Sequence, residues 1–377
     1  MNTTYLRPAR HGGLRQRLVR PLSEAVATQG AALAASPDTQ RHGTIRTLPE
    51  LRAHLQTAIE LEHSTIPPYL TALYTMDANR NPFAYRAIQG VAMEEMLHMV
   101  QACNLLNAVG GHPQIDKPDF VPTYPTYLPH SDDAFLVPLQ KFSKKTLDVF
   151  LQIELPAAPS APPQPHRYHT IGQFYEAIRE ALLMLDASTP GGIFTGDPAR
   201  QVAAEHFYGG GGQLLVVRGL DHALEAIEEI IGQGEGIDRT IFDTDATLFG
   251  QEVELAHYFR FNEVRQGRRY LPADTPREGP TGPEIPVDWE DSVDMAPNPR
   301  LANYPEGSPV WQQMLAFNRT YTRLLRQLHR ACNGHPQVLR EEAVATMYEL
   351  KVQAQALLNL PDGHGRKAGP SFEYAAS

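Results

Sequence analysis

Cysteine is scarce in this sequence. Its 377 residues include two, Cys103 and Cys332, which cannot supply the framework of a disulfide-rich secreted domain. The sequence therefore predicts a reducing, cytoplasmic location. Basic charge is also limited: 33 Lys and Arg face 43 Asp and Glu, for a net charge of −10. Because a general nucleic-acid binder needs a basic surface, we expect no nucleic-acid partner.

Long apolar segments are missing as well. No run approaches the roughly 20 apolar residues of a membrane-spanning helix, so we expect no membrane partner. Residues 1–43 are rich in Ala and Arg but contain no continuous apolar stretch, which argues against a secretory signal. We interpret them as a flexible basic arm. The chain shows no fixed-period repeat and is long enough to bury a large core.

Apolar residues recur at helical spacing through most of the chain, so the predicted fold class is all-α. Thr47 and Glu50 form a capping box at the first helix. Pro67 and Pro68 cannot donate backbone hydrogen bonds, which predicts a kink or break just after Glu62. The predicted helices cover residues 48–66, 82–109, 143–154, 170–185, 213–231, 247–266, 310–332 and 336–360.

Segments rich in Pro and Gly divide the chain into regions. The tetraglycine at 209–212 lacks the Lys-Ser/Thr of a phosphate-binding loop, so we expect a hinge or a close backbone approach there. The predicted regions are the arm at 1–43, a helical bundle at 44–270 with a helical and loop insertion at 112–212, a Pro-rich wrapping loop at 271–309, a helical hairpin packed on the bundle at 310–360, and a disordered tail at 361–377.

Three Glu-x-x-His patterns occur in the chain, although chance alone gives about one. The apolar stripe of the second helix runs through Glu95 and His98, so both side chains should point into the core. The apolar stripe that follows Glu254 and His257 indicates that these two side chains also point into the core. In the pattern formed by Glu60 and His63, the stripe passes through Glu62 instead. A buried carboxylate needs a partner, and a metal ion is an economical partner for carboxylate and imidazole together.

These residues match the ligand pattern of ferritin-like carboxylate bundles, in which two helices supply a Glu each and two supply Glu-x-x-His. The third acid is open between Glu235, beside a glycine-rich turn, and Glu228, nearest the apolar face of its helix. We favour Glu235, because Glu254 lies early in the next helix. Two divalent metal ions are expected, with iron favoured and manganese as the alternative. The predicted ligands are Glu62, Glu95, His98, Glu235, Glu254 and His257.

Four motifs carry a resemblance to a known family. Residues 58–70 (AIELEHSTIPPYL), 94–98 (EEMLH), 233–236 (QGEG) and 254–261 (ELAHYFRF) resemble, in order, the motifs of the VioB-like ferritin-like family, the domain of iminophenyl-pyruvate dimer synthase type. The resemblance covers roughly residues 45–360. It implies a helical bundle with a non-heme metal site and, from well-known members, action on imines derived from aromatic amino acids.

The leading hypothesis is a non-heme di-metal oxidoreductase that acts on a small organic substrate with dioxygen. The alternative is a metal-binding or iron-storage protein without a substrate, which would need an oligomeric cage. A third hypothesis is an empty scaffold whose acids pair with Arg260 and Arg265. Metal content separates the third hypothesis from the first two, and the sequence leaves the oligomeric state open.

Overall fold

The computed structural model describes residues 43–158, 160–209, 211–236, 240–244 and 253–375. Within these ranges the regular elements are helices, as predicted, and nearly all of the arm expected at 1–43 lies outside them. In chain order the α-helices are α3 Leu48–Tyr74, α4 Pro82–Ala108, α5 Lys144–Ile153, α6 Ile171–Ser188, α7 Leu220–Glu235, α9 His257–Gln266, α10 Pro309–Ala331 and α11 Val344–Asn359.

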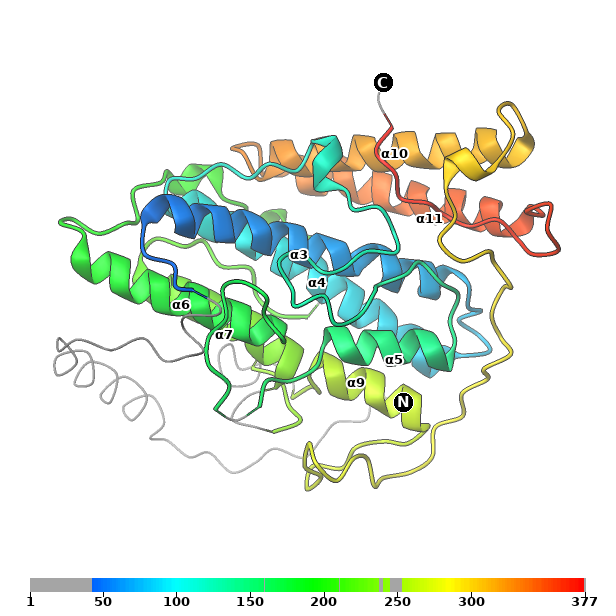
Figure 1. Ribbon diagram of the computed structural model, residues 1–377, viewed down its shortest axis with the longest axis horizontal. Coiled ribbons are helices and arrows are strands. Elements are labelled where there is room, and N and C mark those ends of the chain that lie inside the picture. Colours follow the sequence, from blue (N-terminus) through cyan, green and yellow to red (C-terminus); the bar gives the residue numbers. More distant parts are fainter. Residues whose placement is uncertain (1–42, 159, 210, 237–239, 245–252, 376–377) are drawn as a thin grey trace.

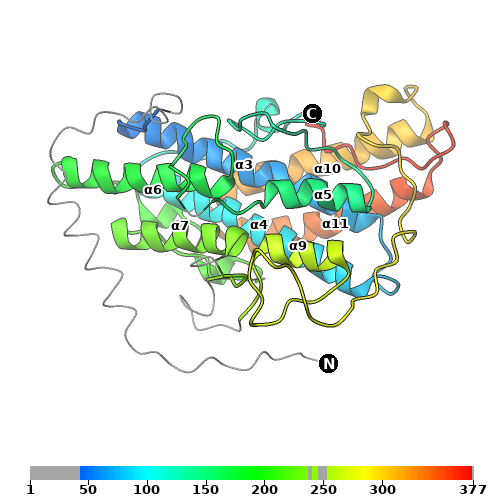
Figure 2. The same cartoon turned by 60° about the horizontal axis from the view of Figure 1, so that its bottom comes forward.

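A four-column bundle forms the centre of the molecule (Figure 1). The long antiparallel helices α3 and α4 supply two columns. In Figure 2, α6 and α5 follow one another along the bundle and make the third column, while α7 and α9 make the fourth. The helices of the region predicted as an insertion are therefore bundle members: α6 packs on α3 and α7, and α5 packs on α3 and α9. The third and fourth columns are each interrupted near the middle of the bundle, where α5 and α7 end and α6 and α9 begin.

Helix α3 does not break at its two prolines. The prediction of a kink or break after Glu62 is wrong in its stronger form, because the helix continues through Pro67 and Pro68 to Tyr74. Pro68 has no N–H to offer the carbonyl of Ser64, and the hydroxyl of Tyr124 donates to that carbonyl at 2.8 Å instead. A side chain from a distant loop thus replaces a missing helical hydrogen bond.

Replacing Tyr124 with phenylalanine should destabilise the protein by about 1 kcal/mol, because the Ser64 carbonyl loses this buried donor. Chemical denaturation measures the change in the free energy of unfolding. Tyr127→Phe is the matched control, since Tyr127 is 45% exposed. Equal stability of the two variants would contradict this role for Tyr124.

The last bundle helix is shorter than expected. The sequence predicts a helix at 247–266, but α9 begins at His257, and residues 253–256 are not helical. Residues 247–252 lie outside the described ranges. Glu254 therefore precedes the helix, and the three-residue spacing to His257 does not place the two side chains on one helical face.

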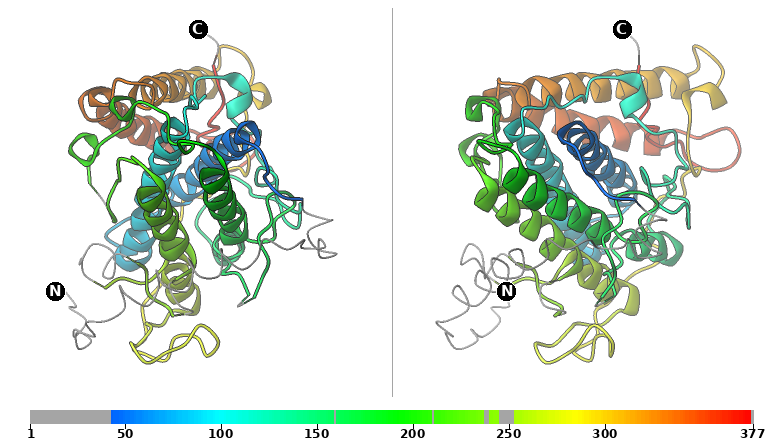
Figure 3. Two further views of the ribbon diagram at one scale, coloured as in Figure 1. Left: turned by 90° about the vertical axis from the view of Figure 1, so that its left-hand side faces the viewer. Right: turned by 60° about the vertical axis from the view of Figure 1, so that its left-hand side comes forward.

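The hairpin of α10 and α11 lies across α3 and α4, on the side away from α6 and α7 (Figure 3). The described part of the segment after it, residues 361–375, packs against the hairpin, contrary to the expected disordered tail. Phe372 is buried against Phe317 and Tyr321, and Asn318 binds the backbone N–H of Glu373. None of the helices in the described ranges has both the length and the apolar character to cross a bilayer.

Candidate metal centre

Helices α3 and α4 present three polar side chains to the middle of the bundle. Glu62 comes from α3, and Glu95 and His98 come from α4; each is at most 2% exposed. The Nδ1 atom of His98 lies 3.4 Å from Glu95 Oε1 and 3.8 Å from Glu62 Oε2. The helical spacing of Glu95 and His98 places both on the inward face, as the sequence predicted.

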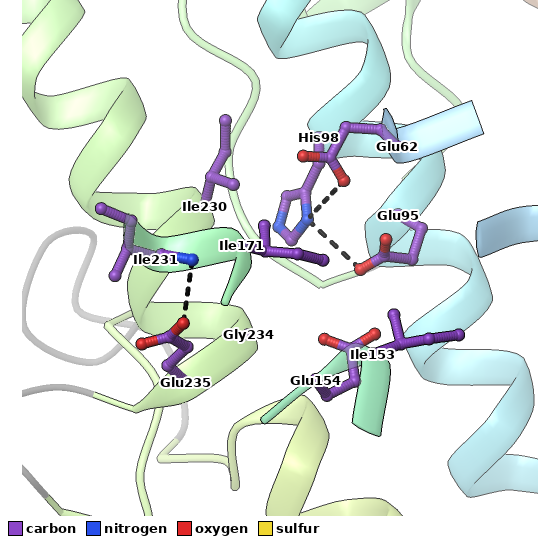
Figure 4. Close-up of a pocket in the computed structure, with 11 residues that line it drawn as sticks. Glu62, Glu95, His98, Ile153, Glu154, Ile171, Ile230, Ile231, Gly234 and Glu235 are labelled. Carbon is purple, nitrogen blue, oxygen red and sulfur yellow. Dashed lines mark hydrogen bonds and ion pairs between the residues drawn. The ribbon is translucent and has the colours of Figure 1, made fainter. Parts of the chain in front are cut away.

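The interrupted columns complete the cluster. Glu154 caps the C-terminus of α5, and His257 is the first residue of α9. The Nδ1 atom of His257 lies 3.0 Å from Glu95 Oε1 and 3.3 Å from Glu154 Oε2. Two groups of donors result, Glu62–Glu95–His98 and Glu95–Glu154–His257, each with ligand atoms within 4.8 Å of one another. Glu95 belongs to both, and Figure 4 shows its carboxylate between Glu62, His98 and Glu154.

Both imidazoles are oriented by a second partner. The Nε2 atom of His98 is 2.6 Å from the Gln233 side-chain oxygen, and that of His257 is 2.8 Å from Glu94 Oε2. These contacts place a proton on Nε2 of each ring and leave Nδ1 facing the carboxylates. Outer hydrogen bonds of this kind fix the tautomer and raise the basicity of a metal-binding histidine.

Each of the three acids accepts one hydroxyl hydrogen bond. Tyr175 donates to Glu62 Oε1, and Tyr69 donates to Glu154 Oε1. Thr65 donates to Glu95 Oε2 at 2.8 Å. These bonds hold the three carboxylates in place and leave their remaining oxygens turned toward the two imidazoles.

Histidine is the basic side chain that faces these acids. In the described part of the chain, no Lys or Arg is ion-paired with Glu62, Glu95 or Glu154. Burial and the neighbouring Glu95 charge raise the pKa of Glu62 well above its ordinary value, and burial likewise raises the pKa of Glu154. Burial opposes ionisation of Glu95 too, but the proximity of His257 and His98 outweighs it and holds its pKa low.

Arg260 neutralises a different acid. It contacts Glu94 Oε1 at 2.7 Å and Asp243 Oδ2 at 3.3 Å. Although burial opposes it, the Arg260 charge helps to lower the pKa of Glu94 to about 2. Arg265 pairs with Asp148 on an exposed part of the surface. Neither arginine enters the cluster, although Arg260 pairs with Glu254, one of the predicted ligands.

The donor set suits divalent metal ions. Three buried carboxylates and two imidazole nitrogens are ligands that iron and manganese accept. The Nδ1 atom of His257 is fully buried and makes no hydrogen bond among the described residues, despite its short distances to two carboxylates. An imidazole nitrogen this close to anionic oxygens needs a positive charge between them, which either a proton or a metal ion supplies. The residues present therefore fit a metal centre.

A small cavity of about 20 Å3 adjoins the cluster. Its polar wall is made by the acids and His98, and its apolar wall by isoleucines (Figure 4). This volume accommodates one water-sized molecule, since a water needs about 10–15 Å3 measured in the same way. An organic molecule would require the walls to move.

The third acid lies beside the cluster, not within it. Glu235 borders the cavity, but its carboxylate accepts backbone N–H groups of Gly172 at 2.9 Å and Ala157 at 2.8 Å. A Cβ at Gly172 would overlap this carboxylate. Burial raises the pKa of Glu235 to about 7, against the lowering effect of these hydrogen bonds. The alternative, Glu228, is exposed, whereas the neighbouring Glu229 is buried.

Glu254, like Glu235, is a predicted ligand that the structure does not bring into the cluster. Its side chain is 53% exposed and its Oε2 lies 3.3 Å from Arg260. The physical reason is the late start of α9, which leaves Glu254 in extended chain. Glu154 contacts His257 where Glu254 was expected to do so.

Sequence reasoning missed Glu154, although a signal was present. On α5, Leu147 and Phe150 are buried, and Glu154 follows them at spacings of seven and four residues, on the same helical face. Glu95 was selected because it lies on the apolar face of its helix, and the same test would have selected Glu154 as well. Glu94 and Gln233 gave no comparable signal, because their partners come from other helices.

Glycines let a loop approach these outer residues. A Cβ at Gly211 would overlap Glu94, and one at Gly212 would overlap Gln233 and Glu229. Both glycines have positive φ angles, of 20° and 83°. The close backbone approach expected for the tetraglycine is therefore confirmed at these two positions, and it covers the outer side of the cluster.

The bundle and its carboxylate–imidazole cluster define a ferritin-like protein. The sequence model of the ferritin-like family matches residues 55–266, more than half of the chain, so the chain belongs to this family. A ferritin-like protein of Caulobacter vibrioides has a similar fold, with a TM-score of 0.58 at 23% identity, covering 88% of this chain and 100% of that one.

Two curated relatives refine the family. Dichlorochromopyrrolate synthase of Lentzea aerocolonigenes is 27% identical over 327 residues, covering 76% of this chain and 29% of that protein. The 2-imino-3-(indol-3-yl)propanoate dimerase of Chromobacterium violaceum is 25% identical over 389 residues, covering 91% of this chain and 35% of that protein. The resemblance to VioB-like ferritin-like proteins is thereby confirmed, and the chain spans about a third of the length of these relatives.

Proposed function

We propose that this chain is a non-heme two-metal oxidoreductase that acts on a small organic molecule with dioxygen, and that its substrate is an imine derived from an aromatic amino acid. The observation that carries the proposal is the pair of overlapping donor groups that share Glu95 in a buried position. The choice of an imine is supported by the likeness to the 2-imino-3-(indol-3-yl)propanoate dimerase of Chromobacterium violaceum. Iron is the proposed metal, with manganese as the alternative.

Each residue has a role in this proposal. Glu95, which both donor groups share, would help to hold both metal ions, one with Glu62 and His98 and the other with Glu154 and His257. Bound iron would supply redox chemistry toward dioxygen. The cavity beside the cluster has room for a molecule of the size of dioxygen, and isoleucines form its apolar wall.

Glu235 is proposed to accept and donate protons during the reaction. Its carboxyl group lies on the wall of the cavity, and its pKa, raised to about 7 by burial, allows it to exchange a proton near neutral pH. The backbone N–H groups of Gly172 and Ala157 hold the charged form in position.

The test uses the full chain loaded anaerobically with ferrous iron. We expect about two iron ions per chain, measured by elemental analysis. After exposure to oxygen, iron oxidation should stop at this stoichiometry. An imine generated from tryptophan by an amino-acid oxidase, with catalase present, should be converted to a product detectable by mass spectrometry.

Two results would contradict the proposal. Accumulation of ferric iron far beyond two ions per chain, with no imine product, would support the storage alternative. Failure to retain any divalent metal would exclude both. Glu95→Ala protein is the control for background conversion, because it lacks the acid that both donor groups share.

A further inference from the structure

A second, larger cavity lies between the bundle and the C-terminal hairpin. It has a volume of about 200 Å3 and is enclosed by α3 and α4 on one side and by α10 and α11 on the other. Figure 3 shows the hairpin lying over these two helices. The wall is apolar and rich in methionine and leucine, and it includes Leu73, Met93, Met96, Leu325, Met347 and Leu350.

This cavity is separate from the metal centre, and the two share no lining residue. On α3, Glu62 faces the metal centre while His63 and Ile66 face the larger cavity. On α4, Glu95 faces the metal centre and Met96 the larger cavity. The two helices thus form a wall between a polar site and an apolar one.

Two polar points interrupt the apolar lining. His63 is 3% exposed, and its Nε2 atom is 2.5 Å from the hydroxyl of Tyr321. Its Nδ1 atom makes no hydrogen bond among the described residues. The bond to Tyr321 fixes the ring in the wall, and His63 is a polar residue in a largely apolar lining.

The second polar point carries charge. Lys351 lines the cavity, and its Nζ atom is 3.1 Å from the hydroxyl of Tyr85. It is partly exposed, and the neighbouring Tyr348, which also lines the cavity, is 70% exposed, so this part of the wall reaches the surface. Among the described lining residues there is no Asp or Glu. The cavity therefore offers a positive charge at its opening. No acid among its described lining residues competes with a ligand for this charge.

We infer that this cavity is a binding site for a small apolar carboxylic acid, with its apolar body between the methionines and its carboxylate at Lys351. An apolar protein cavity of about 150 Å3 is large enough to bind benzene, so this one has room for one or two rings. Methionine side chains are flexible and polarisable, which suits them to adapt to such a body. The inference does not depend on the proposed function of the metal centre.

Isothermal titration calorimetry with naphthalene-2-carboxylate tests the inference on the full chain, with 2-naphthalenemethanol as the uncharged probe. We expect the acid to bind, and to bind about twofold to fivefold more tightly than the alcohol, as a partly exposed ion pair allows. Lys351→Met should remove this preference, and Lys351→Arg should retain it. Ala92→Phe and Met347→Trp should each block the cavity and abolish binding of both probes.

No heat from the acid, equal affinity for acid and alcohol, or binding that survives both blocking variants would each overturn the inference. Circular dichroism and metal content establish that the blocking variants are folded. The Glu95→Ala variant separates the two sites: it should bind naphthalene-2-carboxylate as the unaltered chain does, even when it no longer holds metal.

Discussion

Replacing Glu95 with alanine is expected to remove most of the metal from both positions of the centre. Glu95 is the one residue common to both donor groups, and its Oε1 lies 3.4 Å from His98 Nδ1 and 3.0 Å from His257 Nδ1. Loss of an orienting neighbour of a ligand alone costs about 10- to 100-fold in metal affinity, so loss of a shared ligand should cost about 100-fold or more. The measurement is iron per chain after dialysis, with His257→Ala as a second variant that loses metal.

Glu254→Ala is the matched control for this experiment. It removes a carboxylate of the same kind from a side chain that is 53% exposed and paired with Arg260. We expect it to keep about two metal ions per chain. Full metal retention by Glu95→Ala, with its helical circular dichroism unchanged, would disprove the assignment of the centre.

Replacing Glu154 with glutamine is expected to halve the metal content, because Glu154 belongs to only one of the two donor groups. Glutamine has nearly the same shape and can still accept the hydrogen bond from Tyr69, so the change removes charge with little loss of packing. The remaining ion should lie with Glu62, Glu95 and His98. Elemental analysis gives the stoichiometry, and titration with ferrous iron should show one tight site in place of two.

Glu62→Gln provides the complementary test. It should also leave about one ion per chain, now held by the group that contains Glu154 and His257. The double variant should retain almost none. If Glu154→Gln protein binds two ions with unchanged affinity, Glu154 is not a ligand, and the exposed Glu254 would have to be reconsidered.

Much of the centre was predictable from local spacing. Glu95 and His98 lie one turn apart on a long regular helix, where position along the sequence decides which way a side chain points. Glu62 was selected over Glu60 by the same reasoning, and the structure buries Glu62 at 1% exposure. Prediction succeeds here because α3 and α4 remain regular throughout.

The same reasoning failed where helices end. Glu254 and His257 have the right spacing, but α9 begins at His257. The spacing therefore does not place the two side chains on one face of a helix. Glu235 ends α7, and its carboxylate accepts a hydrogen bond from the backbone N–H of Gly172, the second residue of another helix, α6. Glu154 reaches the cluster from the end of α5, a helix that the sequence placed in an insertion. Side-chain directions at helix ends depend on what the ends pack against.

The sequence by itself determined the helical class, the two long inward-facing helices and the chemical character of the site, because hydrophobic period and ligand type are local properties. The tertiary structure alone decided which acids complete the cluster and which are held elsewhere. It did so by interrupting two bundle columns at the same depth, where Glu154 and His257 meet Glu95. It also enclosed the apolar cavity beneath the C-terminal hairpin. Contacts between segments more than a hundred residues apart carry no local signal, and they exist only once the chain has packed.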